Sequence, residues 1–158
     1  MDTAVTQKLK CPIAIEFVIP EDKLNEAKNS RNGLFSEWFD ASNIPGVEYC
    51  IGIYPNNPEH EGETWIHFAI SSSEDKLNID AVFNMTIKSA NYVFKKHHIF
   101  EEEDCVEEKL CTTEELFDPA KRFIVDGEMT IYMEGIFFYL SINFYWIDYY
   151  SSRIFSNG

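Results

Sequence analysis

Apolar and polar residues alternate over several short stretches of the chain, and this period of two is typical of β-strands with one buried face. The most regular stretch covers residues 79–88, where only Val82 breaks the alternation. Similar stretches predict strands at residues 13–20, 49–55, 65–70, 91–100 and 129–134. Short strands separated by turn residues are typical of sandwiches and barrels. The sequence therefore predicts an all-β fold.

A helix start and a tight turn precede the last of these strands. Thr112 and Glu115 have the spacing of a capping box, which predicts that a helix begins there. Pro119 ends this helix after little more than one turn, because proline disfavours helical geometry at the residue before it. Asp126 and Gly127 predict a tight turn, since glycine readily adopts a positive φ. We therefore expect one short helix, then a turn and a strand.

The segments outside these strands are interpreted from their composition. Residues 1–12 are polar, so we expect a flexible N-terminus before a single domain at residues 13–138. Residues 21–32 are charged and contain turn residues, and we interpret them as a connection with room for a helical turn. A short strand is expected at residues 34–39.

Residues 139–158 form an aromatic C-terminal tail of unknown role. The apolar run at residues 136–147 is too short for a membrane-spanning helix, which needs ~20 residues. We expect part of it to be the last strand of the fold. The remainder could cover a groove, pair with a partner, contact a membrane interface or reflect a truncated product, and the sequence leaves these alternatives open.

The chain has 158 residues and a net charge of −14, from 13 basic and 27 acidic residues. This acidity argues against nucleic acid or an anionic membrane as a partner, because both are bound mainly through Lys and Arg. It is compatible with a basic or hydroxyl-rich peptide, and also with a role in solubility alone. The four cysteines have no disulfide-framework spacing and no signal peptide is evident, so we expect an intracellular protein, cytoplasmic or nuclear.

The sequence contains residues that could form three kinds of chemical site. His97, His98, Cys105 and Cys111 are residue types that bind zinc, but adjacent strand residues point to opposite faces, so we expect no metal site. A cysteine nucleophile is disfavoured because acidic neighbours raise a thiol pKa, and no nucleophile or nucleotide motif occurs. The acidic run at residues 101–115 is interpreted as a solvated loop or an attractor of basic peptides. We expect neither an enzyme nor a cofactor.

Four pieces of the chain, at residues 49–56, 65–70, 81–87 and 116–135, resemble in their order and spacing the meprin-and-TRAF-homology (MATH) family. The resemblance covers residues 13–138. It implies an eight-stranded antiparallel β-sandwich with one short helix, which binds an extended peptide of another protein. The chain has no coiled-coil heptads, so we expect a monomer.

The resemblance also implies positions for a peptide-binding groove. These positions are Phe68, Ala69, Phe83, His98, Cys105 and Glu107. Periodicity instead places Phe68 and Phe83 on core faces, and a gap of one residue would move the first position to Ala69.

Two groove aromatics of the family are replaced where its Trp-Gly-Phe segment aligns with Cys105, Val106 and Glu107. We therefore expect altered specificity, with Glu107 favouring a peptide that carries Lys, Arg or a hydroxyl group.

We interpret the chain as a non-catalytic protein-interaction module. In relatives that also contain a BTB domain, the MATH domain recruits substrates to a cullin-based ubiquitin ligase, so an adaptor role in ubiquitination is implied. Two alternatives are a sandwich or barrel that binds a small apolar ligand, and an accessory domain of a protease or deubiquitinase system.

Overall fold

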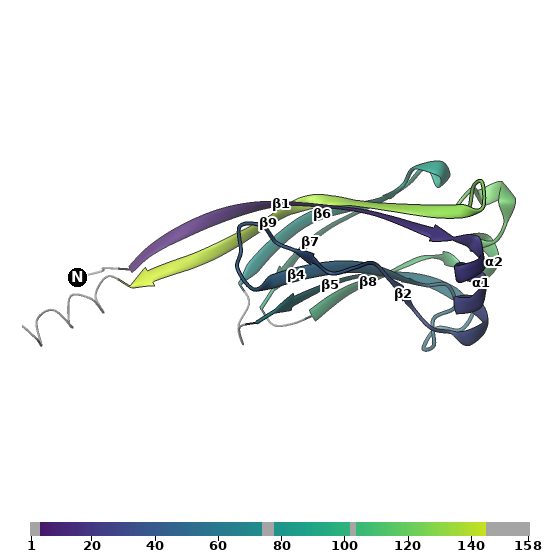
Figure 1. The fold of residues 1–158 in the computed structure, drawn as a ribbon, viewed down its shortest axis with the longest axis horizontal. Helices are drawn as coiled ribbons and strands as arrows, with labels where there is room; N and C mark the ends of the chain where they lie inside the picture. The colour runs from purple at the N-terminus through teal and green to yellow at the C-terminus, as the bar shows by residue number, and fades with distance from the viewer. Residues whose placement is uncertain (1–3, 74–77, 102–103, 145–158) are drawn as a thin grey trace, which may run out of the picture.

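The computed structural model describes residues 4–73, 78–101 and 104–144, which fold into two facing antiparallel sheets (Figure 1). The strands are β1 Ala4–Pro20, β2 Leu34–Phe35, β3 Phe39–Asp40, β4 Val47–Tyr54, β5 Glu63–Ser72, β6 Ile79–Ile87, β7 Tyr92–Phe100, β8 Asp104–Thr112 and β9 Glu128–Phe144. The helices are α1 Glu21–Ser30, α2 Thr113–Leu116 and the 3-10 turns Lys88–Ala90 and Pro119–Lys121. None of the described helices is long and apolar enough to cross a membrane.

One sheet has the strand order β1-β9-β6-β7, and the other has the order β2-β4-β5-β8, with β3 also paired to β4. The expected all-β sandwich is confirmed. We expected eight strands, and the described residues form nine. The run at 34–39 contributes to two separate two-residue strands, and strand β8 occupies most of the acidic run that we interpreted as a solvated loop. Strand β5 contains a register shift at Thr64 and Trp65, where it pairs with β8.

Strands β1 and β9 are the longest elements, with 17 residues each. They pair residue by residue from Ala4 opposite Phe144 to Pro20 opposite Glu128, and they extend beyond the other strands (Figure 1). The expected boundaries at residues 13 and 138 therefore fall inside strands, and the segment expected to be flexible is a strand from Ala4 onwards. Backbone pairing does not require apolar side chains, which is why composition misplaced these ends. The rest of the aromatic tail lies outside the described residues.

The helix α1 occupies much of the segment that we interpreted as a connection. Only two of its residues, Leu24 and Ala27, are buried, so its apolar pattern is too sparse to predict a helix. The acidic residues Glu21 and Asp22 in its first turn stabilise it through the helix dipole.

The predicted capping box of α2 is confirmed. The amide of Glu115 donates to Oγ1 of Thr112 over 3.1 Å, and the amide of Thr112 donates to Oε1 of Glu115 over 3.1 Å. This reciprocal pair satisfies two amides that the first helical turn leaves unbonded.

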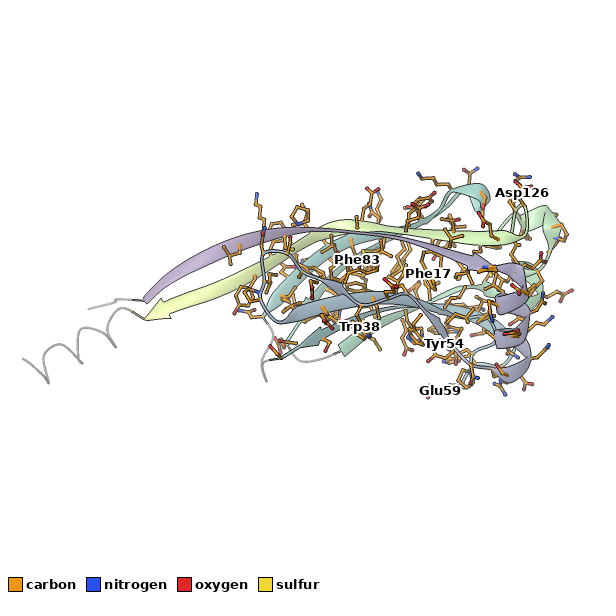
Figure 2. The ribbon with its side chains drawn as sticks, viewed as in Figure 1. Phe17, Trp38, Tyr54, Glu59, Phe83 and Asp126 are labelled. Atoms are coloured by element: carbon orange, nitrogen blue, oxygen red, sulfur yellow. The ribbon has the colours of Figure 1, made fainter. Side chains whose placement is uncertain are left out.

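Aromatic rings fill the space between the sheets. The centroid of Phe68 on β5 lies 4.6 Å from that of Phe83, 5.7 Å from that of Phe100 and 6.0 Å from that of Phe137. All four side chains are buried, and Figure 2 shows Phe83 between the two sheets. These spacings are those of rings in direct contact, so this part of the interior is occupied by the protein itself.

Candidate functional site

One row of residues crosses the outer face of the five-stranded sheet. Phe35 on β2 lies opposite Gly52 on β4. Gly52 lies opposite His67 on β5, and His67 lies opposite Glu107 on β8. Alternate residues of a strand point to opposite faces, and Phe68, next to His67, is fully buried. His67 and the rest of the row therefore face away from the core.

Gly52 makes room for the ring of Phe35 to lie over the sheet. A Cβ atom at residue 52 would lie 2.5 Å from Cε1 of Phe35, closer than real contacts allow. The Phe35 ring reaches the imidazole of His67 at a centroid distance of 6.4 Å, and the Tyr54 ring approaches it to 4.7 Å. The side chain of His67 is only 12% exposed as a result, although it is on an outer face.

Three side chains that can bind a metal ion converge at the β8 end of this row. Nδ1 of His67 is 3.6 Å from Oε1 of Glu107, and Sγ of Cys105 is also 3.6 Å from Oε1 of Glu107. One ligand atom of each residue lies within 4.8 Å of those of the other two. Nε2 of His67 is buried and has no hydrogen-bond partner among the described residues. We refer to His67, Cys105 and Glu107 as the β5–β8 triad.

Burial controls the protonation of His67. Desolvation lowers the pKa of the imidazole below its ordinary value of 6.5, and the nearby Glu107 carboxylate opposes this shift. Burial is the larger effect, so the ring is held neutral at neutral pH. A neutral imidazole keeps a nitrogen lone pair, which is the form that accepts a proton or binds a metal ion.

A shallow pocket of about 100 Å³ adjoins the triad. It is lined by Tyr54, Asn57, Pro58, Glu59, His67 and Glu107. Figure 2 shows Tyr54 and Glu59 on the side of the five-stranded sheet that faces away from the other sheet. The pocket therefore places a further carboxylate-bearing residue and space for water beside the His67–Glu107 pair.

The structure brings together three of the residues predicted for the groove. Ala69 and Cys105 are directly opposite each other on β5 and β8, and Glu107 follows on the same outer face. Phe68 and Phe83 are instead fully buried and in contact with each other, which corrects the groove positions implied by the resemblance. Their core location is the one that periodicity predicted.

The predicted residue His98 lies on β7, with its ring 4.5 Å from that of Phe100. Strand β7 ends the four-stranded sheet, as β8 ends the other sheet. Tyr92 of β7 lies near Glu108 and Cys111 of β8. Burial is the main cause of the raised pKa of the Tyr92 phenol, and these two groups raise it further. The two sheets therefore present their terminal strands on the same side of the sandwich.

The zinc and nucleophile candidates considered from the sequence are separated in the fold. His97 is hydrogen-bonded to Asp80 on the outer face of the four-stranded sheet, whereas Cys105 is on the outer face of the other sheet. Cys111 is buried, and this burial raises the pKa of its thiol to about 12. The main cause is desolvation, and the acidic neighbour Glu115 raises the pKa further in the expected direction, by a smaller effect. Cys111 is therefore protonated at neutral pH.

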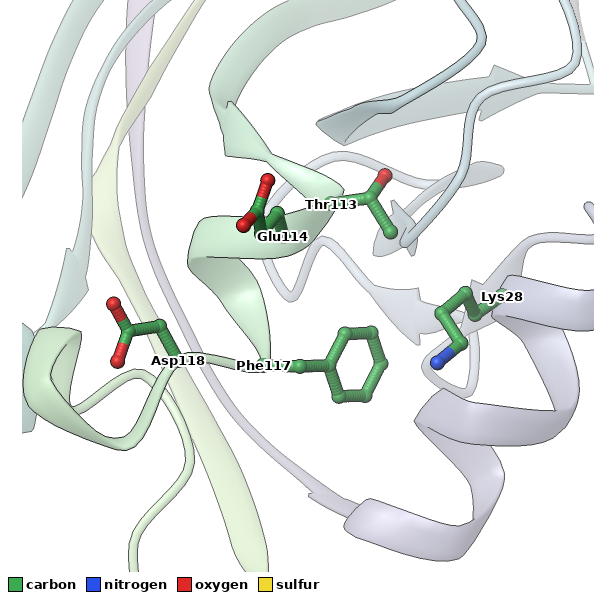
Figure 3. A pocket seen from close by; sticks show the side chains of 5 residues that line it. All are labelled: Lys28, Thr113, Glu114, Phe117 and Asp118. Carbon is green, nitrogen blue, oxygen red and sulfur yellow. The ribbon is translucent and has the colours of Figure 1, made fainter.

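A larger hollow of about 540 Å³ lies between α1 and α2 (Figure 3). It is lined by Lys28, Thr113, Glu114, Phe117 and Asp118. Nζ of Lys28 lies 4.5 Å from the centroid of the Phe117 ring, a cation–π contact between the two helices. Its polar lining and the internal pairing of its one basic residue make it a contact between helices, and we assign no ligand to it.

Sequence reasoning missed His67 as a functional residue. Its alternation with Ile66 and Phe68 did predict an outward position, but nothing in the sequence signalled its neighbours. Glu107 is 40 positions away, and the two meet only through the register of β5 with β8. No family model matches this chain, and no curated protein sequence matches it at a significant level.

Proposed function

We propose that this protein is a non-catalytic module that binds an extended peptide of another protein along the outer edge of β8. The observation that carries the proposal is the position of β8. Among the described residues it pairs on one side only, with β5. An unpaired strand edge presents backbone N–H and C=O groups that a peptide can pair with by strand addition.

The charge of β8 indicates which peptides it would favour. Glu107 is exposed on the outer face, and the half-buried Glu108 alternates with it towards the β7 side. Acidic side chains along an edge attract a basic strand and repel an acidic one, which affects partner choice and the association rate. The proposed partner is therefore an extended segment with Lys, Arg or hydroxyl-bearing residues.

The resemblance to the MATH family supports the same proposal, since it implies a sandwich of antiparallel sheets that binds peptides. By that resemblance, the module would recruit a partner for ubiquitination together with a separate ligase component. The interior gives less support to a small apolar ligand, because rings of the protein occupy the described space between the sheets.

A peptide-library selection on the full chain tests this proposal. We expect a consensus enriched in basic or hydroxyl-bearing residues, with affinity for a basic peptide reduced about tenfold by Glu107→Lys, because attraction becomes repulsion. Glu134→Lys is the matched control, since Glu134 is an exposed residue of β9 on the other sheet. This control should bind as the unchanged chain does.

Two results would contradict the proposal. One is the absence of any enriched peptide from a folded, monodisperse sample. The other is an enriched peptide whose binding Glu107→Lys and Glu134→Lys weaken equally, because net charge and not the β8 edge would then determine binding.

A further inference from the structure

We propose that the β5–β8 triad of His67, Cys105 and Glu107 binds a divalent transition-metal ion, with Zn²⁺ as the best fit. The three ligand types, imidazole nitrogen, thiolate sulfur and carboxylate oxygen, are those of zinc sites in proteins. This site was not expected from the sequence, because its residues are brought together by strand pairing and not by a local motif. It does not depend on the proposed peptide binding.

The distance between His67 and Glu107 fits two ligands of a shared ion better than it fits a hydrogen bond. Nδ1 of His67 and Oε1 of Glu107 are 3.6 Å apart, which is too long for an N–H···O hydrogen bond. In a tetrahedral site with Zn–N and Zn–O bonds of about 2.1 Å and Zn–S bonds of about 2.3 Å, two ligand atoms are about 3.4 to 3.6 Å apart. The Cys105 thiol donates a hydrogen bond to Oε1 of Glu107 over 3.6 Å, a distance that also fits two zinc ligands. The shared ion would replace this hydrogen bond when the thiol loses its proton.

The packing around His67 prepares it to be a ligand. The rings of Phe35 and Tyr54 hold the imidazole in place, and its Nε2 makes no hydrogen bond within the described residues. A buried nitrogen without a partner is unusual in a folded protein. Among the described residues, no hydrogen bond at Nε2 therefore has to be broken when Nδ1 binds an ion.

The charges and the solvent access also fit a divalent ion. When zinc binds, the Cys105 thiol releases its proton to solvent, and the resulting thiolate together with the Glu107 carboxylate balances the 2+ charge. Cys105 and Glu107 are exposed, so an ion can reach them from solvent. The adjoining pocket supplies a fourth position for water, and Glu59 lines the same pocket.

The ion would connect the edge strand to the rest of its sheet. Two ligands lie on β8 and one on β5, so the metal would bridge these neighbouring strands. An ion that binds the folded chain more tightly than the unfolded chain raises stability by mass action. A zinc-dependent increase in thermal stability is therefore expected in addition to binding.

The test uses the reduced full chain, titrated with ZnSO₄ by calorimetry and with CoCl₂ by absorption spectroscopy. We expect one Zn²⁺ per chain, a higher melting temperature with Zn²⁺, and a near-ultraviolet thiolate-to-cobalt charge-transfer band. Cys105→Ser should remove the band and weaken zinc binding by at least about tenfold. His67→Gln should weaken zinc binding by a similar factor. Cys105 is exposed, so its serine variant is expected to fold.

His97→Gln is the matched control, because His97 is an exposed histidine paired with a carboxylate on the other sheet, without a thiol in the pair. Its zinc affinity should equal that of the unchanged chain. The proposal is overturned if the chain does not bind zinc, or if Cys105→Ser binds Zn²⁺ and Co²⁺ as the unchanged chain does. Neither readout uses a peptide, so failure of the metal site and failure of peptide recognition are distinguishable.

Discussion

The outer faces of the two sheets both carry a histidine beside a carboxylate, yet they treat it differently. On the five-stranded sheet, Phe35 and Tyr54 cover His67, whose side chain is 12% exposed. On the four-stranded sheet, His97 pairs with Asp80 and remains 61% exposed. The comparison shows that placing a histidine beside a carboxylate on a neighbouring strand does not by itself bury the histidine. The aromatic rings packed against His67 remove water from its imidazole.

The neighbours of His97 explain why its side chain remains exposed to solvent. Val82, Ile99 and Ile136 are exposed by 47%, 55% and 38% on the outer face of the four-stranded sheet. Side chains of a strand stand roughly perpendicular to the sheet, so branched aliphatic groups cover little of a neighbouring ring. On the other sheet Gly52 leaves a gap that the Phe35 ring fills.

The largest expected effect is on the free energy of unfolding, and it should differ between alanine substitutions of two glycines, one in each sheet. In Gly135→Ala, the new Cβ would meet the carbonyl oxygen of Val82 and lie 2.7 Å from Cα of Phe83, so backbone must move. We expect a loss of about 2–3 kcal/mol in the free energy of unfolding, as for other overpacked sites. Gly52→Ala meets mainly the partly exposed ring of Phe35, which can rotate away, and should cost about 1 kcal/mol. Urea denaturation measures both, and equal losses would contradict the contrast.

A smaller effect is expected from removing the covering ring itself. Phe35→Ala should lower the free energy of unfolding by about 1 kcal/mol, because the ring packs against Tyr54 and His67 while half exposed. It should also move the pKa of His67 up towards its ordinary value, since burial is the main cause of the depression. NMR titration of the imidazole measures the second effect. Val82→Ala, on the other face, is the control and should leave the His67 pKa unchanged.

The smallest expected effect is a change in pH dependence. Burial lowers the pKa of folded His67, so the unfolded chain binds this proton at a higher pH than the folded chain does. The stability from neutral His67 is complete above pH 6.5 and is lost as the pH falls from there through the folded pKa. His67→Gln should therefore flatten the stability profile below pH 6.5, as measured by urea denaturation at several pH values. If His97→Gln flattens it equally, burial of His67 is not the cause.

The sequence was sufficient to predict the fold class, because alternation at residues such as Phe68 and Phe83 assigned core faces correctly. The groove positions failed at the same two residues. Alternate residues of a strand point to opposite faces, so an alignment error of one residue moves a side chain from one face to the other. The alternation of apolar and polar residues depends only on the geometry of one strand, so an alignment error does not affect it.

The triad could not be predicted, because it depends on tertiary register. His67 and Glu107 are opposite each other only after the register shift between Thr64 and Trp65 is included. A bulge of this kind has no unique sequence signal. Helix α1 was missed for a different reason. Leu24 and Ala27 are its only buried residues, so its hydrophobic periodicity is weak. Its stability comes mainly from tertiary contacts, which the sequence pattern does not show.

The long pairing of β1 with β9 has a consequence for how the protein folds. Within the described residues the only strand that pairs with β1 is β9, and the two strands are separated in sequence by the whole of the remaining sandwich. Contacts between distant positions are slow to form, because a long loop must close before they contribute. During synthesis, β1 remains unpaired until residues 128–144, which form β9, have emerged from the ribosome. Completion of the four-stranded sheet is therefore a late step, and an unpaired β1 is the species most exposed to association with other chains until then.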